Sequence, residues 1–242
     1  MARKEELPEW EVLLRAAAHL QQILPDATLV GGTAAAVEAG HRRSADADHV
    51  VPDLISRFDA VLAQLEAAAG WKTARRQRPV VIKGQLDGIM TTVRNLRRTA
   101  PLETREVEVA GSVVRVPTPA EILRIKSWLI VDRNATRDFL DVAAISDKLG
   151  LEASARALAS LDRLYPQGDD SGAVRQQLMR QLAQPRPFDL DEVKPQLGQY
   201  KGIAARWRDW TAVEKQCRAL AVELAEAVAN RREGWTDVGA AR

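Results

Sequence analysis

The chain has 242 residues, of which 46% are hydrophobic and 28% are charged. This composition is ordinary for a globular protein, and the length allows one large domain or two modest ones. The net charge of +2 excludes a uniformly basic or acidic chain. The single cysteine excludes an intrachain disulfide and a cluster of cysteine ligands around a metal.

The cysteine content and the hydropathy of the chain indicate where it works. One cysteine, Cys217, fits a reducing compartment. The first residues lack the long apolar core of a signal peptide, and no run of about 18 apolar residues is present. We therefore expect a cytoplasmic protein that does not enter a membrane.

The first half of the chain alternates between helical and strand-like patterns. Apolar residues at helical spacing predict a helix over 7–24, which Pro25 ends. The elements expected next are a strand at 28–30, a short helix at 34–39, a strand at 49–51, and a helix from Asp53 to about residue 69. Further strands are expected at 80–82 and 86–93 around a turn at Gly84, and a hairpin at 106–109 and 113–116.

The second half is almost entirely helical. It begins at Thr118, followed by Pro119 and Glu121, which together form a typical helix start. Helices are then expected at 137–148, 151–164, 172–183 and 210–232. The predicted fold is α/β (α+β), with a mixed α/β domain over 1–117 and a helical domain over 118–242.

Two aspartates separated by one residue, Asp46 and Asp48, form the most informative motif. On a strand they point to the same face, where two carboxylates repel each other unless a cation lies between them. Mg²⁺ (or Mn²⁺) prefers such oxygen ligands and shares them with substrate phosphates. Asp87, within an apolar segment, is a candidate third metal ligand, although it also fits a turn position beside Gly88.

A phosphate-binding segment precedes the aspartates. Gly31 and Gly32 follow a strand, and glycines allow backbone amides to approach a phosphate closely. The helix that follows presents its N-terminus to the same anion. Thr33 and Ser44 add hydroxyl donors, so the segment is expected to hold the triphosphate of a nucleotide.

Positive charge is concentrated between Trp71 and Arg105. This stretch holds Lys72, Arg75, Arg76, Arg78, Lys83, Arg94, Arg97, Arg98 and Arg105, against the acids Asp87 and Glu103. Clustered cations bind polyanions by phosphate contact and counterion release, which predicts a nucleic-acid acceptor, with Arg97 and Arg98 among its contacts. The alternative is a solvated basic face without a ligand.

The segment Gly31-Gly32-Thr33, followed by Arg43, Ser44, Asp46 and Asp48, resembles the signature of the nucleotidyltransferase fold, and specifically the AbiEii/AbiGii toxin family. The later residues Lys126, Arg133, Arg137, Asp138 and Asp141 resemble that family's second signature. The resemblance covers roughly residues 29–145. It implies a twisted mixed sheet flanked by helices and a helical C-terminal domain that closes over the cleft.

The resemblance also implies a reaction and its residues. A nucleoside monophosphate would pass from an NTP to an acceptor such as tRNA, and a cognate antitoxin protein would restrain the enzyme. Two metal ions would be held by Asp46, Asp48 and Asp87, while Arg43 would join the nucleotide-binding residues. Lys126 would neutralise the leaving pyrophosphate, and Asp141 would orient Lys126 or contact the nucleotide.

Other interpretations stay open on the sequence alone. Lys126 also fits a lysine that buries its stem at a helix edge, and Asp141 also fits a buried ion pair. For the whole chain, the alternatives are a non-catalytic nucleotide-binding regulatory module of the same fold and a nucleotidyltransferase that modifies a small molecule such as an antibiotic.

Overall fold

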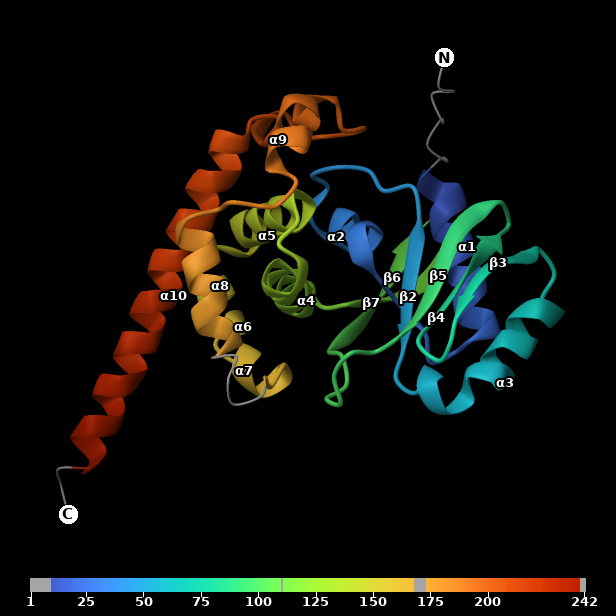
Figure 1. Cartoon of the computed structure of the whole chain (residues 1–242), viewed down its shortest axis with the longest axis horizontal. Helices are drawn as coiled ribbons and strands as arrows, with labels where there is room; N and C mark the ends of the chain where they lie inside the picture. The colour runs from blue at the N-terminus through green and yellow to red at the C-terminus, as the bar shows by residue number, and fades with distance from the viewer. Residues whose placement is uncertain (1–9, 110, 168–172, 240–242) are drawn as a thin grey trace. The chain divides into compact units, whose positions relative to one another are not determined.

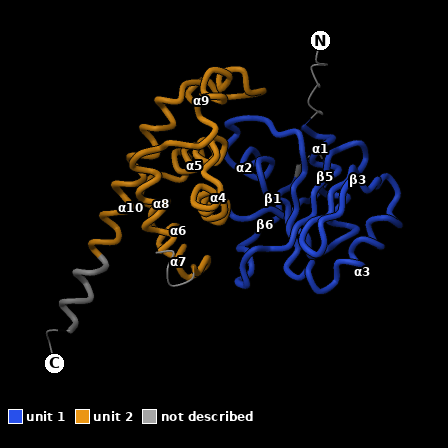
Figure 2. The backbone as a smooth tube through the Cα atoms, viewed as in Figure 1, with its two compact units in different colours: residues 1–118 blue, residues 119–242 orange. Residues whose placement is uncertain are grey.

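The computed structural model describes residues 10–109, 111–167 and 173–239 (Figure 1). It divides into two compact units, Met1–Thr118 and Pro119–Arg242 (Figure 2). The boundary lies one residue from the position that the sequence predicts, where Pro119 begins a helix. The first unit is mixed α/β and the second is helical, which is the predicted fold class.

A five-stranded mixed sheet forms the centre of the first unit. Its strands, in the order in which they lie side by side, are β1 (Thr28–Val30), β2 (Ala47–Val51), β5 (Ile89–Asn95), β4 (Val81–Leu86) and β3 (Trp71–Gln77). β2 and β5 are parallel and the other neighbours are antiparallel. The predicted hairpin is present as a separate two-stranded sheet of β6 (Thr104–Val109) and β7 (Ser112–Pro117).

Two helices pack against one face of this sheet. Apolar residues of α1 (Trp10–Ile23) and α3 (Leu54–Ala67) share a core with the strand residues Ile82, Leu86 and Val93. Because side chains alternate along a strand, the neighbours of these core residues point to the opposite face. That face of β3, β4 and β5 therefore carries the polar half of each strand.

The turn between β4 and β5 lies at Asp87 and Gly88, so the predicted turn at Gly84 is wrong. Leu86 pairs with Ile89, and both residues of the two-residue loop have positive φ, 51° and 81°. Asp-Gly is a preferred sequence for such a hairpin turn. Gly84 instead lies inside β4. The Trp71 ring packs against it, and a Cβ at this position would stand 2.5 Å from the indole, so the strand requires glycine here.

The segment that leads to the predicted aspartates folds nearly as expected. β1 runs into α2 (Gly31–Ala39), whose helix begins at the first glycine, three residues earlier than predicted. Gly40 ends the helix in the left-handed conformation, with φ 62°. The loop after it leads into β2, so the N-terminus of α2 and the start of β2 come together.

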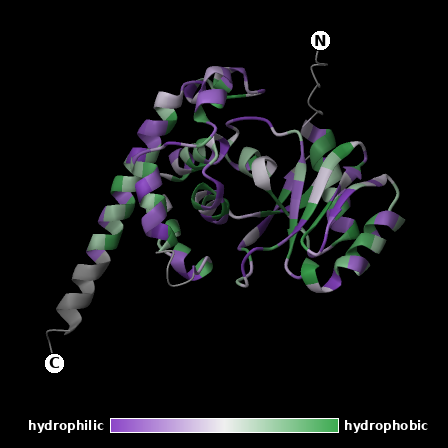
Figure 3. Ribbon diagram, viewed as in Figure 1, coloured by the Kyte–Doolittle hydropathy of each residue, from purple (hydrophilic) through white to green (hydrophobic). Residues whose placement is uncertain are grey.

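The second unit is built from packed helices. They are α4 (Pro119–Arg133), α5 (Thr136–Leu149), α6 (Leu151–Leu158), α7 (Leu161–Leu164), α8 (Val174–Ala183), α9 (Leu190–Val193), the 3₁₀ helices Lys194–Gln199 and Ala205–Trp207, and α10 (Trp210–Gly239). The predicted helix over 151–164 is therefore interrupted between α6 and α7. Figure 3 shows the helices striped with hydrophobic and hydrophilic residues, as expected for helices with one buried side.

The hydropathy of the helices also bears on membrane insertion. Within the described ranges, no helix combines the length and the apolar character needed to cross a bilayer.

Candidate functional site

Asp48 lies against the N-terminus of α2. A Cβ built on Gly31, the first residue of that helix, would stand 2.8 Å from Asp48 Oδ2 and 3.0 Å from Asp48 Cβ. Gly31 also has φ 73°, a conformation that side chains other than glycine rarely adopt. Only glycine therefore allows the carboxylate to approach the unpaired backbone amides at the start of the helix.

Asp46 is held from two sides by hydroxyl groups. Ser44 Oγ donates a hydrogen bond to Asp46 Oδ1 at 2.9 Å, and Thr33 Oγ1 donates to the backbone oxygen of Asp46 at 2.5 Å. Both hydroxyl residues are buried, whereas Asp46 is exposed. These two hydroxyl groups therefore hold Asp46 in place, while their role as phosphate donors stays a prediction.

Arg42 is a site residue that sequence reasoning missed. A Cβ on Gly32 would stand 2.7 Å from Arg42 Nη2 and 3.1 Å from Ser44 Oγ, so the guanidinium lies over the first turn of α2. The sequence prediction chose its neighbour Arg43, which is exposed. Two adjacent arginines in a loop cannot be told apart by spacing, because neither helical nor strand periodicity applies there.

Asp87 does not join the other two aspartates, and its prediction as the third metal ligand is corrected. Asp87 Oδ2 lies 2.7 Å from His19 Nδ1 on α1, next to the face that α1 and α3 cover. Asp48 alternates with the buried Ala47 and His49, so its side chain points to the other face. No group of three potential His, Cys, Asp or Glu ligands occurs within the described ranges.

The remaining donor set still fits a divalent cation that shares its ligands with a substrate. Mg²⁺ commonly takes one or two carboxylates and completes its shell with water and phosphate oxygens. Asp46 and Asp48 supply two carboxylates beside a helix N-terminus that attracts phosphate. The set suits one metal, whereas the predicted second metal has lost the ligand on which it depended.

His49 faces away from the aspartates. Its side chain is completely buried against α1, and desolvation of the charged form lowers the pKa of His49 to about 3. Backbone groups of Ala47 and Ala17 oppose this shift in part. His49 is therefore a neutral core residue at physiological pH and takes no part in the surface formed by Asp46 and Asp48.

Lys126, Asp138 and Asp141 form a buried charge cluster in the second unit, which the exposed Arg133 contacts. Lys126 Nζ lies 2.7 Å from Asp141 Oδ2 and 3.7 Å from Asp138 Oδ1. Arg133 donates two hydrogen bonds to Asp138, at 2.7 and 2.8 Å. This contact with Asp138 is the main cause that raises the pKa of Arg133 above its usual value. Both aspartates are 0% exposed and Lys126 is 3% exposed, whereas Arg133 is exposed. One buried and one exposed cation therefore balance the two buried anions.

The cluster explains the second signature in physical terms. Asp138 and Asp141 are three residues apart on α5, so they share a face and need cations there. α4 supplies both, because it carries Lys126 and ends at Arg133. Arg137, the other arginine of the second signature, is exposed.

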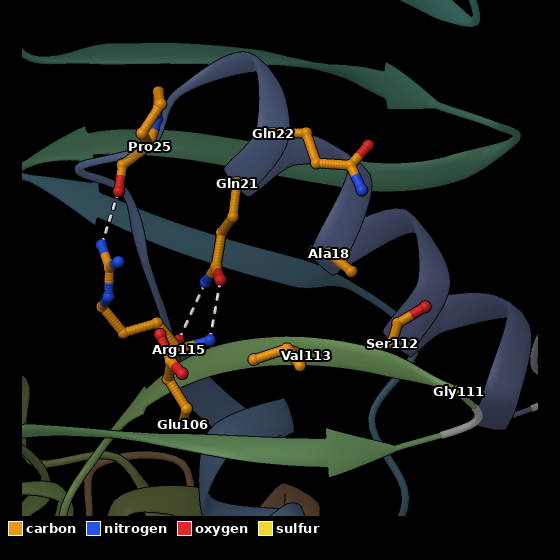
Figure 4. Close-up of a pocket in the computed structure, with 9 residues that line it drawn as sticks. All are labelled: Ala18, Gln21, Gln22, Pro25, Glu106, Gly111, Ser112, Val113 and Arg115. Carbon is orange, nitrogen blue, oxygen red and sulfur yellow. Dashed lines mark hydrogen bonds between the residues drawn. The ribbon is translucent and has the colours of Figure 1, made fainter.

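A hollow of about 450 Å³ in the first unit lies apart from these residues. It is lined by residues of α1, β6 and β7 and the segments beside them, and none of the predicted site residues lines it (Figure 4). The amide of Gln21 exchanges two hydrogen bonds with the backbone of Arg115, at 2.8 and 2.7 Å. The side-chain amide of Gln21, which lines the hollow, is therefore already used in joining α1 to β7.

The buried His49 gives a pH test of this packing. The unfolded chain binds a proton near pH 6.5, whereas the native pKa is about 3, so stability is complete above pH 6.5 and falls as the pH drops. Between about pH 6.5 and pH 5 the wild type should lose about 2 kcal/mol from this residue. Urea unfolding at both pH values measures the loss, and His49→Leu should remove it; an equal loss in His49→Leu contradicts the assignment.

The charge cluster predicts a different pattern of stability. Lys126→Met leaves Asp141 buried beside too little positive charge, and should lower the free energy of unfolding by about 3–5 kcal/mol. Lys126→Met combined with Asp141→Leu removes both charges and should recover most of this loss. Urea unfolding measures both variants. If the single variant is as stable as the wild type, the cluster is not the tight ion pair that the distances indicate.

Sequence comparisons find relatives that match about half of the chain. No family model matches it. Over 133 residues it is 38% identical to the mycolic acid-containing lipids exporter MmpL11 of Mycolicibacterium smegmatis. Over 132 residues it is 36% identical to the heme uptake protein MmpL11 of Mycobacterium tuberculosis. The matched region is 54% of this chain but 13% of each relative, so the chain spans a small part of their length.

Solved structures similar to this chain are nucleotidyltransferase-like proteins. A proposed nucleotidyltransferase from H. pylori has a TM-score of 0.49 and 17% identity, and the match covers 95% of this chain and 99% of that one. The antibiotic-resistance factor ANT(2'')-Ia has a TM-score of 0.47 and 14% identity, over 62% of this chain and 90% of that one. An antigenic nucleotidyltransferase-like protein from Paracoccidioides brasiliensis has a TM-score of 0.46 and 18% identity, over 65% and 89%. At these values the likeness identifies neither a substrate nor an acceptor for this chain.

Proposed function

We propose that the chain is a metal-dependent nucleotidyltransferase that transfers a nucleoside monophosphate from an NTP to a nucleic-acid acceptor. The observation that carries the proposal is the contact of Asp48 with Gly31, beside Asp46, at the N-terminus of α2. This arrangement combines a carboxylate pair for a cation with backbone amides for phosphate. The resemblance to the AbiEii/AbiGii family suggests tRNA as the acceptor.

Electrostatics explain why a metal is required. A triphosphate that approaches the start of α2 meets the negative charges of Asp46 and Asp48, and like charges at such distances repel strongly. A cation between them converts the repulsion into attraction. Arg42, whose guanidinium lies over Gly32, adds positive charge on the other side of the same helix turn.

The reaction exchanges one bond at phosphorus for another. The acceptor hydroxyl gives up its proton to solvent and attacks the α-phosphorus. The bond from the α-phosphorus to the bridging oxygen breaks, and pyrophosphate leaves with the electron pair. Bound Mg²⁺ would neutralise phosphate oxygens and polarise the α-phosphoryl group. Asp46 and Asp48 would hold that cation, while Ser44 and Thr33 keep Asp46 in place.

Lys126 and Asp141 enter the proposal through the family resemblance. In that role Lys126 neutralises charge on the departing pyrophosphate, and Asp141 orients it through the contact of 2.7 Å. The same contact leaves the lysine within a charge-balanced cluster. The double variant Lys126→Met with Asp141→Leu separates the two roles, because it restores stability without restoring a cation.

A toxin role follows from the same resemblance and is proposed with it. Transfer of nucleotides to tRNA would stop translation, and a cognate antitoxin protein would hold the enzyme in check. Growth arrest on expression in a host, lost with Asp48→Asn, would support this role. A small-molecule antibiotic fits less well as the acceptor, because aminoglycosides are cations and the stretch from Trp71 to Arg105 is rich in cations as well.

One observation favours a second candidate, a nucleotide-binding module without turnover. The predicted third carboxylate lies elsewhere, and no three-ligand group occurs in the part of the chain that the structure describes. Such a module would bind NTP with Mg²⁺ but transfer nothing. Measuring binding and transfer on the same preparation distinguishes the two candidates.

Transfer itself is measured with each labelled NTP, Mg²⁺ and total tRNA. The wild type should label tRNA, and Asp46→Asn or Asp48→Asn should reduce the rate by about 100-fold or more, because several kcal/mol of charge stabilisation depends on the metal. Asp87→Asn is the matched control, since it removes one carboxylate from the other side of the sheet and should retain transfer.

The outcomes have different meanings. NTP binding without transfer in the wild type supports the non-catalytic module. Neither binding nor transfer with any NTP contradicts both candidates. Loss of transfer in Asp87→Asn, in a variant that remains folded, would restore the three-carboxylate site that the sequence predicted.

A further inference from the structure

Strand register places four cations on the uncovered face of the five-stranded sheet. Asp48 is level with Thr92 on β5, Thr92 with Lys83 on β4, and Lys83 with Arg75 on the edge strand β3. Lys72 and Arg94 lie on the same face, because Lys72 pairs with Gln85 and Arg94 with Val81, both of which alternate with core residues. We call Lys72, Arg75, Lys83 and Arg94 the basic sheet face.

The cations of the basic sheet face have no anionic partner among the residues that the structure describes. Within the described residues, no salt bridge or side-chain hydrogen bond involves any of the four. Arg75 and Lys83 are direct cross-strand partners, and like charges in that position destabilise a sheet. The sheet therefore carries an electrostatic cost that an anionic ligand would remove.

The other cations of the same basic stretch are already satisfied. Arg76 pairs with Glu66 at 2.5 Å and Arg78 pairs with Asp59, both on α3 at the covered face. Arg98 is buried, and its guanidinium donates to the backbone oxygens of Ala100 and Pro101 at 3.0 and 2.9 Å. The sequence prediction of Arg98 as an acceptor contact is therefore wrong, because this arginine holds its own loop together.

The residues around the four cations indicate which class of anionic ligand fits this face, namely a phosphate backbone. The neutral residues between them include Thr92, Gln85 and Gln77, and Met90 is the exposed apolar residue among them, at 46%. The strands place no aromatic side chain on this face, so base stacking is not provided for. A membrane surface would require large apolar residues to insert, which these strands do not offer here.

We infer that the basic sheet face binds the sugar–phosphate backbone of a nucleic acid, without reading its bases. The row that starts at Asp48 reaches Lys83 after two strand spacings, about 10 Å, and Arg75 after three, about 15 Å. A nucleic acid along this row has one end beside the aspartates. The assignment of this ligand as the acceptor rests on the proposed function, whereas binding to the face does not require turnover.

The test measures binding of the full chain to labelled tRNA and to a single-stranded RNA, by fluorescence anisotropy between about 50 and 200 mM KCl without NTP. Four phosphate contacts to a single strand predict a slope of log K against log salt of about −3. Arg75→Gln with Lys83→Gln should reduce the slope by about 1.4 and weaken binding about 25-fold at 100 mM KCl, since two fewer counterions are released.

The matched control is Arg76→Gln with Arg78→Gln, which removes the same charge from the covered face and should leave the affinity and the slope unchanged. The Arg75/Lys83 variant should also melt at or above the wild-type temperature, because it relieves a like-charge pair. Equal losses in the two double variants, or unchanged binding in both, overturn the assignment. Binding to vesicles of anionic phosphatidylglycerol in place of RNA also overturns it.

Two further outcomes separate this inference from the proposed function. RNA binding that depends on Arg75 and Lys83, without any nucleotide transfer, supports the basic sheet face and contradicts the enzyme. Transfer to tRNA whose rate at limiting acceptor is the same in the wild type and in the Arg75/Lys83 variant supports the enzyme and contradicts the basic sheet face.

Discussion

The repulsion between two carboxylates at the start of a helix is the constraint on which the site depends. Asp48 lies against Gly31, and Asp46 is fixed by Ser44 and Thr33. The helix N-terminus stabilises one negative charge nearby, but a bound triphosphate adds several more. The carboxylates and the phosphates can lie side by side only if a cation binds between them. Because Gly31 allows Asp48 to approach the helix, the conformation of this glycine leads to the metal requirement.

Charged side chains are arranged differently in the two units. In the second unit, the buried Lys126 and the exposed Arg133 balance Asp138 and Asp141, so burial of the two aspartates is tolerated because each has a cationic partner. In the first unit, Arg75 lies directly opposite Lys83 on the neighbouring strand. Like charges in that position cost stability, and in a chain that otherwise pairs its buried ions they indicate a surface that meets a ligand.

Local signals in the sequence predicted much of the fold. Glycines after a short strand, a Thr-Pro-x-Glu helix start and the hydrophobic periodicity identified β1, α2 and the helices of the second unit. The edge strand β3 was missed because only Trp71 of its residues is buried, so its alternation is hidden among charged residues. A turn at Asp87 and Gly88 was left as an alternative, although Asp-Gly is a hairpin signal, because the break between the strands was placed at Gly84.

The candidate site was predicted only where it is local in sequence. Asp46, Asp48 and Ser44 lie close together in the chain, and the structure brings them together at α2. Asp87 was predicted as a third ligand because it is a charged residue in an apolar segment. That prediction placed the turn at Gly84, and an error in the position of a turn changes the face of the sheet to which a side chain is assigned. The pairing of Arg75 with Lys83 depends on register between strands, which no single-sequence pattern reveals.

The central claim, that Asp46 and Asp48 need a cation in order to accept phosphate, is tested most directly by calorimetric titration of NTP with and without Mg²⁺. The wild type should bind Mg–NTP more tightly than metal-free NTP by at least about tenfold, which corresponds to about 1.4 kcal/mol. Asp48→Asn should lose this preference and bind metal-free NTP better than the wild type does, because one repelling charge is gone. Equal affinity of the wild type for NTP with and without Mg²⁺ would contradict the account.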